Sequence, residues 1–288
     1  MRKIGEIKMN KESIKIFILK YQLILYFIFV LMISWSFWIP MALSKLGLIY
    51  FPIPIIIGST IGAFSPFITI IIFEKLTDKE ISLQKIFANS KPKKNHIGWF
   101  FLAACLIPLS QIFGNFIYFI LTPGAELIII NLEILESLGF WLLIIIPITF
   151  FAGLLTSPLG EEPGWRGFAI PRLQKKFGLL FGSLLLGTFW WTWHQPINIA
   201  NGLEVSFYSY CGMVISSFIY DVLFNFTQKN VLCAMFAHSS SFITNTYIIR
   251  NSNNWWSVLI LFFSMAILRL IEWKRLSFKN QTKNISQK

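Results

Sequence analysis

The sequence predicts an all-α integral membrane protein, built as a single bundle of about eight transmembrane helices. Hydrophobic residues make up 55% of its 288 residues, charged residues make up only 13%, and the mean hydropathy is +0.64. A soluble domain this apolar would lack the polar side chains needed to cover its surface. The apolar residues also form continuous runs, each close to the ~20 residues that cross a hydrocarbon core ~30 Å thick. The predicted environment is therefore a lipid bilayer, and no length remains for a sizeable soluble domain.

The apolar runs predict the transmembrane segments directly. Lipid offers backbone N–H and C=O groups no hydrogen-bond partners, so a spanning segment must be a helix or part of a closed barrel. The runs are continuously apolar and do not alternate with a period of two residues, which predicts helices. In chain order, the predicted spans are residues 17–44, 53–73, 97–121, 139–159, 178–199, 206–226, 230–249 and 255–271.

The basic residues predict how these spans are oriented. Of the 25 Lys and Arg residues, all except Lys45 and Arg250 lie on one side of the predicted spans. On the opposite side, the connection between the third and fourth spans contains Glu126, Glu133 and Glu136 and no basic residue. The positive-inside rule then predicts that both termini are cytoplasmic, in what we expect to be a bacterial plasma membrane. Because topology explains the net charge of +12, the charge does not indicate a nucleic-acid partner.

The predicted spans also set the organisation of the chain. Residues 1–16 form a basic cytoplasmic segment, residues 17–273 form the membrane domain, and residues 274–288 form a polar C-terminal tail. The catalytic core is expected at about residues 139–249, where the ionisable residues described below lie. Three cysteines fall inside apolar runs without CxxC spacing, so we expect neither disulfides nor a cysteine metal site; they are Cys105, Cys211 and Cys233.

A few ionisable residues lie inside the apolar runs or at their ends. A charged side chain within the hydrocarbon costs roughly 3 kcal/mol or more unless it is paired, so each is a candidate for a functional site. Asp221 lies near the cytoplasmic end of its span, and we interpret it as a helix-packing or cytoplasmic hydrogen-bonding residue. His96 lies in a basic loop and is expected in solvent. The remaining candidates are Glu161, Glu162, Arg166, His194 and His238.

The two adjacent glutamates are predicted to have different surroundings. If a helix begins near residue 161, with Pro163 in its first turn, then Glu162 and Arg166 stand at i,i+4 and can form an ion pair. Glu161 is turned about 100° away from Glu162 around the helix and lacks that partner. We therefore predict that Glu161 is free to face a cavity. Glu162 and Arg166 are predicted to form a pair that fixes the helix, takes part directly in catalysis, or does both.

The two histidines are predicted to lie at the same depth as Glu161. A turn at residues 177–178 would place Glu161 and His194 each about 16 residues away from it, provided that the chain bends near residues 157–164. His238 lies well inside its own span. A carboxylate and two imidazoles can hold a divalent metal such as zinc, or they can activate a water directly. Both routes lead to hydrolysis of a carbonyl compound.

At these residues the sequence resembles the CAAX prenyl protease type II and bacteriocin-processing family of intramembrane proteases, also called the Abi family. The first family motif, a double glutamate followed by an arginine, matches Glu161, Glu162 and Arg166. The second motif, an aromatic residue four positions before a histidine, matches Trp190 and His194. The GAFSP stretch near residue 62 also resembles the family.

The third family motif is only half present. It consists of a histidine followed four residues later by Asn or Asp, and here His238 is followed by Phe242. In the family this polar residue is thought to help a histidine hold the oxyanion or a ligand, which Phe242 cannot do. Asn245 lies about two helical turns after His238, so it can serve in part, and Ser239 and Ser241 are other candidates.

The resemblance implies an eight-helix fold and an active site between the fourth and seventh spans. It also implies cleavage of a peptide or membrane-protein substrate, by a mechanism described both as metal-dependent and as glutamate-activated water. On this basis we expect Glu161, assisted by His194, to activate a water. His238 would stabilise the oxyanion or share a metal with the other two.

Other functions remain open at this point. Glu161 could be an interfacial charge, His194 part of an aromatic belt, and His238 a hydrogen-bonding residue between helices. The incomplete third motif favours a non-catalytic alternative, such as a bacteriocin self-immunity protein that binds a toxin or its receptor. The sequence also does not distinguish a prenylated substrate from other peptides or membrane proteins.

Overall fold

The computed structural model is a bundle of helices, which confirms the all-α prediction. Within the described residues there is no strand, and an isolated bridge joins Ile130 to Ile248. The structure describes residues 10–91, 93–203, 205–249 and 254–285. Arg250, one of the two basic residues predicted on the non-cytoplasmic side, lies outside this description.

Long helices follow the predicted spans, and shorter ones connect them. The long helices are α1 (Lys11–Lys45), α2 (Ile55–Ala63), α3 (Ser65–Leu76), α5 (Ile97–Leu121), α7 (Leu142–Gly153), α10 (Leu179–Ala200), α11 (Phe207–Phe226), α12 (Val231–Tyr247) and α13 (Trp256–Ile285). The short elements are α4 (Leu83–Phe87), the 3-10 turn η1 (Lys94–His96), α6 (Leu132–Leu138), the 3-10 turn η2 (Gly139–Trp141), α8 (Ser157–Glu162), the π-helix η3 (Pro163–Ala169) and α9 (Ile170–Phe177).

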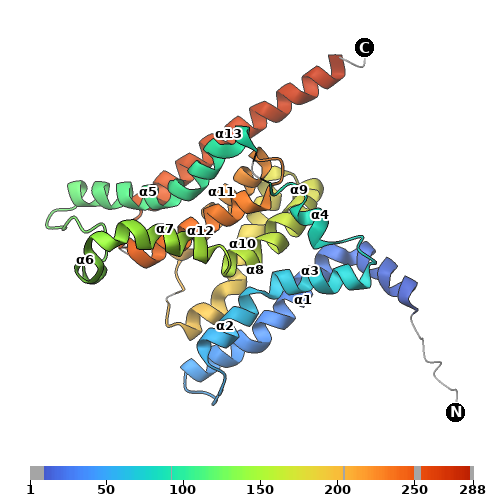
Figure 1. Cartoon of the computed structure of the whole chain (residues 1–288), viewed down its shortest axis with the longest axis horizontal. Coiled ribbons are helices and arrows are strands. Elements are labelled where there is room, and N and C mark those ends of the chain that lie inside the picture. The colour runs from blue at the N-terminus through green and yellow to red at the C-terminus, as the bar shows by residue number, and fades with distance from the viewer. Residues whose placement is uncertain (1–9, 92, 204, 250–253, 286–288) are drawn as a thin grey trace.

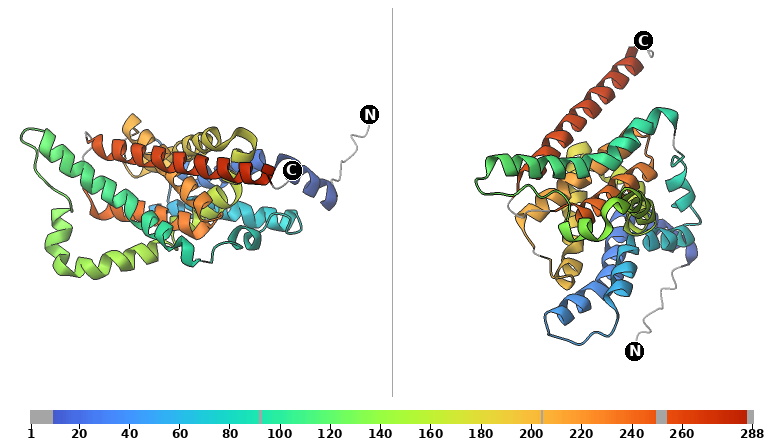
Figure 2. Two further views of the ribbon diagram at one scale, coloured as in Figure 1. Left: turned by 90° about the horizontal axis from the view of Figure 1, so that it is seen from above. Right: turned by 60° about the vertical axis from the view of Figure 1, so that its left-hand side comes forward.

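The bundle has two distinct ends. Figures 1 and 2 show that α1 begins and α13 ends on the same side of the molecule, where α4 also lies, whereas α6 lies on the opposite side. We call the first side the basic end, because its loops and short helices carry lysines such as Lys85, Lys175 and Lys229. The far end contains α6, the last turn of α12 and the first turn of α13. The assignment of the basic end to the cytoplasm stays a prediction.

Hydrogen bonds join the segments at the far end. The amide of Asn131 donates to the carbonyl of Tyr247 at 3.1 Å, so α6 starts beside the end of α12. The Asn115 amide on α5 donates to the carbonyl of Ile249 at 2.9 Å, and the Asn254 amide donates to Asn115 Oδ1 at 2.9 Å. The far ends of α5, α12 and α13 are therefore held together by side-chain amides.

The described residues include five helices that are long and apolar enough to cross a membrane, or six if the bent pair α2 and α3 is one span. The protein is thus an integral membrane protein. The other two predicted spans are also helical, but α12 has only 17 residues and α10 contains several Trp residues together with His194. The number of eight membrane crossings stays a prediction.

The termini of the bundle differ from the predicted segment boundaries. α1 begins at Lys11, six residues before the predicted span, because the Asn10 side chain accepts a hydrogen bond from the Ser13 amide at 2.8 Å and caps the helix. α13 continues through Ile285, well past the predicted start of the tail at residue 274. Both predicted polar segments are therefore partly helical.

The chain turns and breaks where the site requires it. Gly178 has φ +80°, which confirms the predicted turn between α9 and α10. Thr156, with φ −98° and ψ −129°, interrupts the helix between α7 and α8, close to the predicted bend. The expectation for His96 was wrong: it is buried, because η1 leads directly into α5 and brings the imidazole into the bundle.

Candidate active site

The segment that carries the two glutamates packs against the bend between α2 and α3. A Cβ atom at Gly160 would lie 2.8 Å from the carbonyl oxygen of Ala63, and one at Gly164 would lie 2.6 Å from Pro66. Only glycine allows the two backbones to approach this closely. The GAFSP stretch, which contains Ala63 and Pro66, therefore supports the site from behind.

The ionisable residues predicted for the site come together in the middle of the bundle. Glu161 and Glu162 end α8, and Arg166 lies in the following π-helix, a form that often occurs at functional sites. His194 is on α10 and His238 is on α12. The two glutamates and the arginine are buried, with at most 1% of each residue's surface exposed.

Glu161 is held by neutral donors. Its Oε2 accepts a hydrogen bond from Trp190 Nε1 at 2.7 Å and a longer one from Trp165 Nε1 at 3.3 Å. Its Oε1 lies 4.0 Å from His194 Nε2. As predicted, Glu161 is not the residue that pairs with Arg166. Its carboxylate is instead bound by two indole N–H groups, one from Trp165 at i,i+4 and one from Trp190 on α10.

His194 is oriented by its own helix. Its Nδ1–H donates to the carbonyl oxygen of Trp190 at 2.8 Å, one turn earlier. Because a carbonyl can only accept, the neutral ring carries its lone pair on Nε2, the atom that faces Glu161. The 4.0 Å between His194 Nε2 and Glu161 Oε1 confirms the prediction that the two residues lie at the same depth.

Glu162 is held by charged partners. The predicted ion pair with Arg166 is present, with 3.2 Å between Glu162 Oε2 and Arg166 Nη1. Arg166 Nε also lies 3.2 Å from Asp221 Oδ1, and its Nη2 donates to Ser217 Oγ at 2.7 Å. Asp221 thus does more than pack a helix, since it supplies the second carboxylate for the buried guanidinium.

The ion-pair network extends to the last helix. Arg269 Nη2 lies 4.0 Å from Asp221 Oδ2 and donates to Ser183 Oγ at 2.6 Å. Arg269 Nη1 donates to Glu272 Oε2 at 2.6 Å. Arg269 is one of the basic residues that the charge pattern places on the cytoplasmic side of the spans, but it is buried in this network. Nothing in the local sequence predicts these contacts, because the partners lie on different helices.

His238 pairs with Glu162 rather than with Glu161. Its Nδ1 lies 2.7 Å from Glu162 Oε1, and its ring stacks on Tyr220 with 5.7 Å between the ring centroids. The Trp190 indole lies edge-on to both imidazoles, at 5.3 Å from His194 and 5.5 Å from His238. The site therefore consists of two carboxylate–imidazole pairs, and Trp190 touches both imidazoles.

The candidates for the third motif have separate places. Ser239 Oγ donates to the carbonyl of Phe150 at 2.6 Å, so it links α12 to α7. Ser241 is hydrogen-bonded to the hydroxyl of Tyr220. Phe242 and Asn245 both line a cavity next to the site. Asn245 thus lies on the same cavity wall as His238, which agrees with the prediction that the two share one face of the helix.

This cavity has a volume of about 570 Å³. It lies between α5 and helices α10 to α13, and the site contributes Trp190, His194, Tyr220 and His238 to its wall. Glu161 is not among the described side chains that line it. Because Glu161 contacts both Trp190 and His194, it lies directly behind the wall.

The predicted metal ligands do not form a metal centre in this arrangement. Among the residues that the structure describes, no group of three or more His, Cys, Asp or Glu side chains could hold a metal ion. Glu161 Oε2 is engaged by two indoles, and His238 Nδ1 is engaged by Glu162. Metal binding by Glu161, His194 and His238 therefore stays a prediction, and we derive no step through a metal.

Comparison with known proteins confirms the resemblance seen in the motifs. Residues 139–244 match the family model described as type II CAAX prenyl endopeptidase Rce1-like. A curated relative, CAAX prenyl protease 2 of Methanococcus maripaludis, is 41% identical over 56 residues. The aligned segment is 19% of this chain and 20% of the relative, so the chain spans about a fifth of the length of the curated relative that it matches. The family match contains both glutamates, the arginine and both histidines.

Proposed function

We propose that this chain is an intramembrane endopeptidase, which hydrolyses a peptide bond of a membrane-associated substrate with a water activated by Glu161 and His194. The observation that carries this proposal is the 4.0 Å between Glu161 Oε1 and His194 Nε2. In the neutral imidazole these are two acceptors without a hydrogen between them. The family match over residues 139–244 supports the same class of reaction.

A water fits this arrangement well. One water molecule can donate one hydrogen to the carboxylate and the other to the imidazole, since each acceptor lies within hydrogen-bond reach of a shared position. The water oxygen then presents its lone pairs to the cavity. Burial of the site removes competing solvent and strengthens each electrostatic interaction.

In this mechanism Glu161 transfers the proton, and the other residues stabilise the oxyanion or position the reacting groups. As the water attacks the scissile carbonyl, Glu161 takes its proton, and the same proton can pass to the leaving amine when the C–N bond breaks. His238, protonated on both nitrogens, donates from Nδ1 to Glu162 and from Nε2 to the developing oxyanion. Arg166 fixes Glu162, which in turn orients His238.

Substitution of the water-activating pair tests the proposal. In purified protein, Glu161→Gln and His194→Ala should each lower kcat for a peptide substrate by roughly 100-fold or more, with helix content and thermal unfolding retained. Glu136→Gln is the matched control, because Glu136 is exposed on α6 and should have no effect. Unchanged cleavage in both site variants would refute the proposal.

A second candidate function is supported by Phe242. This exposed aromatic side chain lies on the cavity wall where the family motif has a polar residue, and an apolar surface suits binding more than oxyanion stabilisation. The second candidate is therefore a non-catalytic protein that confers self-immunity by binding a toxin or its receptor. Immunity that persists in Glu161→Gln cells would favour binding, and its loss would favour proteolysis.

A further inference from the structure

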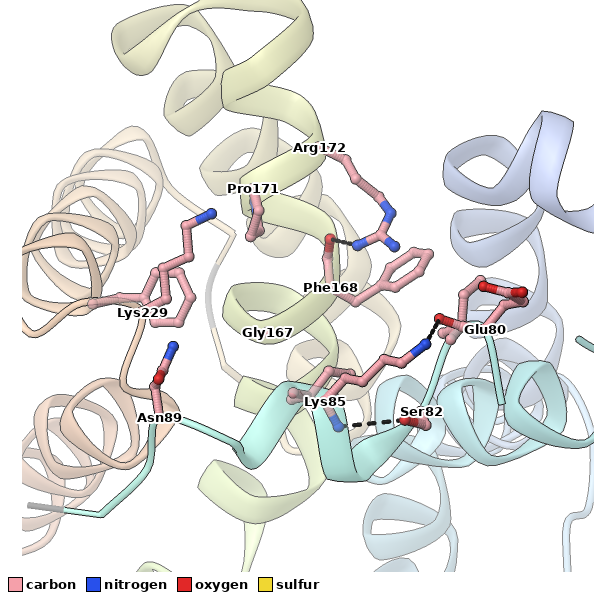
Figure 3. A pocket seen from close by; sticks show the side chains of 12 residues that line it. Glu80, Ser82, Lys85, Asn89, Gly167, Phe168, Pro171, Arg172 and Lys229 are labelled. Carbon is pink, nitrogen blue, oxygen red and sulfur yellow. Dashed lines mark hydrogen bonds between the residues drawn. The ribbon is translucent and has the colours of Figure 1, made fainter. Parts of the chain in front are cut away.

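The basic end has a small pocket next to the π-helix, which Figure 3 shows. It has a volume of about 180 Å³ and is lined by α4 and the loop before it, by η3 and α9, and by the last turn of α11 and the turn that follows. The buried side chains of Ile81, Phe168 and Phe224 supply apolar wall. Because a water takes up about 30 Å³ in the liquid, this space can hold several waters or a phosphate group. Among the described residues, it shares no lining residue with the cavity beside the active site.

The wall of this pocket carries an excess of positive charge. Its cations are Lys85, Arg172 and Lys229, and Glu80 is the one carboxylate among its described lining residues, which leaves a net charge of +2. The Lys85 ammonium donates to the backbone carbonyl of Glu80 at 3.0 Å and not to its carboxylate (Figure 3). Within the described part of the chain, none of the three cations forms an ion pair with a carboxylate. The pocket is therefore cationic.

Arg172 shows most clearly that this charge is not balanced. Its guanidinium is half-buried and lies over the Phe168 ring, with 3.8 Å between Cζ and the ring centroid. Its Nε donates to Gln22 Oε1 at 2.6 Å, and its Nη1 donates to the Phe168 carbonyl at 2.9 Å. Both acceptors are neutral, and Nη2 donates to no other residue that the structure describes. Because burial of a cation costs free energy unless an anion compensates it, a bound anion would stabilise this arrangement.

The two lysines are positioned by local backbone structure. Lys229 follows Gln228 in the turn between α11 and α12, and both have a positive φ, of +63° and +59°, which is uncommon for residues other than glycine. The Lys229 amide donates to the Phe224 carbonyl at 2.8 Å and closes this turn. Lys85 lies in the first turn of α4, where its amide donates to Ser82 Oγ at 3.3 Å. Three separate segments thus each supply one cation to the same pocket.

From these observations we propose that the pocket binds a phosphate group, either that of an anionic lipid headgroup or that of a soluble phosphate ester. A guanidinium offers phosphate a planar pair of donors, and ammonium groups add point charges. The basic end is predicted to face the cytoplasm, where the leaflet is anionic and where basic pockets between transmembrane helices bind lipid headgroups. The proposal does not depend on proteolysis.

A phosphate in this pocket would also stabilise the segment that carries the active site. It would join α4, α9 and the turn after α11 through one ligand. Gly167 and Phe168 line the pocket and belong to the same π-helix as Arg166. Binding to the folded state alone raises the unfolding temperature in proportion to the logarithm of ligand concentration, which makes unfolding a direct readout.

Titration of the purified chain in neutral detergent tests the site. Short-chain phosphatidylglycerol should raise the unfolding temperature, whereas phosphatidylcholine, which has no net charge, should not. The double variant Lys85→Gln/Lys229→Gln should weaken phosphatidylglycerol binding at least tenfold, because two of the three cations are lost. Lys175→Gln/Lys176→Gln is the matched control, since both of these lysines are exposed at the basic end and neither lines the pocket. We expect it to change the affinity by less than about twofold.

A further variant separates a defined pocket from general attraction to a basic surface. Asn89 is exposed, uncharged and part of the pocket wall, so Asn89→Trp should occupy the space without changing the charge. With helix content retained, it should weaken binding at least tenfold. Equal losses in the two double variants, or unchanged binding in Asn89→Trp, would overturn the proposal.

A parallel titration with glycerol 3-phosphate distinguishes the two sources of the phosphate. Binding of phosphatidylglycerol alone would assign the pocket to a lipid headgroup, and binding of glycerol 3-phosphate with similar or higher affinity would assign it to a soluble ester. Either result supports a phosphate site, provided that the Lys85→Gln/Lys229→Gln variant loses it. Absence of binding for both compounds would overturn the proposal.

Discussion

Glu161 and Glu162 are adjacent in the chain, but they lie in two different electrostatic environments. Glu161 is bound by the indole N–H groups of Trp190 and Trp165, which are neutral. Glu162 is bound by Arg166 and by the imidazole of His238. Two identical side chains that are adjacent in the chain thus belong to two halves of the same site. We call them the uncharged half, in which the partners of Glu161 are neutral, and the charged half, in which the partners of Glu162 are charged.

This difference indicates how one helix end can supply two functions. A carboxylate that is paired with a guanidinium is stabilised as an anion and is a poor proton acceptor. A carboxylate held by neutral donors keeps its orientation without a full counter-charge, so it remains available to take a proton from water. The uncharged half is therefore suited to accepting a proton from water. The ion pairs of the charged half are suited to holding four helices and the π-helix in position.

Loss of the central cation should have the largest effect on stability. Arg166→Leu leaves Glu162 and Asp221 buried without their shared partner, so the free energy of unfolding should fall by about 3–5 kcal/mol. Thermal or denaturant unfolding in detergent measures the change. Lys175→Leu removes an exposed cation from α9 and is the matched control. A loss below about 1 kcal/mol for Arg166→Leu would show that the charged half does not stabilise the bundle.

Removal of one indole donor should affect activity more than stability. Trp190→Phe keeps an aromatic ring but removes the 2.7 Å hydrogen bond to Glu161. Hydrogen bonds to charged groups contribute about 1.5–3 kcal/mol, so kcat should fall roughly 10- to 100-fold. Trp191→Phe is the control, because Trp191 Nε1 donates to Ser209 rather than to the site. Equal losses in the two variants would mean that the effect comes from packing and not from Glu161.

The sequence predicts only some of the contacts in the charged half, because most of them join residues that are far apart in the chain. The ion pair of Glu162 and Arg166 depends on helical spacing alone, so it could be predicted. The depth match of Glu161 and His194 needs only the position of a turn. The pairing of Arg166 with Asp221, and of Asp221 with Arg269, depends on how separate helices rotate and pack, which a hydrophobic pattern does not specify. The same limit applies to the choice of carboxylate by His238.

The fold shows the same division between local and long-range information. Run length and continuous apolarity predict where the helices lie, because the hydrocarbon thickness determines their length. The hydrogen bond from Trp190 to Glu161 could not be predicted, since it depends on how α10 packs against α8, whereas Trp165 stands at i,i+4 from Glu161, a spacing that the sequence does contain. Trp190 was recognised as a motif residue, but its hydrogen bond was not.

A polar residue at position 242 should have a smaller effect, which tests whether the third motif limits catalysis. Phe242 is 43% exposed on the cavity wall, so Phe242→Asn should change the free energy of unfolding by less than about 1 kcal/mol. If a polar group there helps the imidazole of His238 to stabilise the oxyanion, kcat should rise severalfold while KM changes little. Phe151→Asn, at an exposed position on α7, is the control for added polarity. A fall in activity would instead indicate that Phe242 contacts the substrate.

Chelation should have the smallest effect if the uncharged half works as its geometry suggests. Two acceptors 4.0 Å apart can hold a water between them, and one of the Glu161 oxygens is already engaged by indoles. We therefore expect dialysis against a strong chelator to change kcat by less than about twofold, because activation of the water depends on Glu161 and His194 alone. A loss of activity that added zinc restores would contradict this expectation, and it would mean that the two carboxylate–imidazole pairs rearrange around a metal. The comparison of the two glutamates would then change as well, because a cation would balance Glu161 as Arg166 balances Glu162.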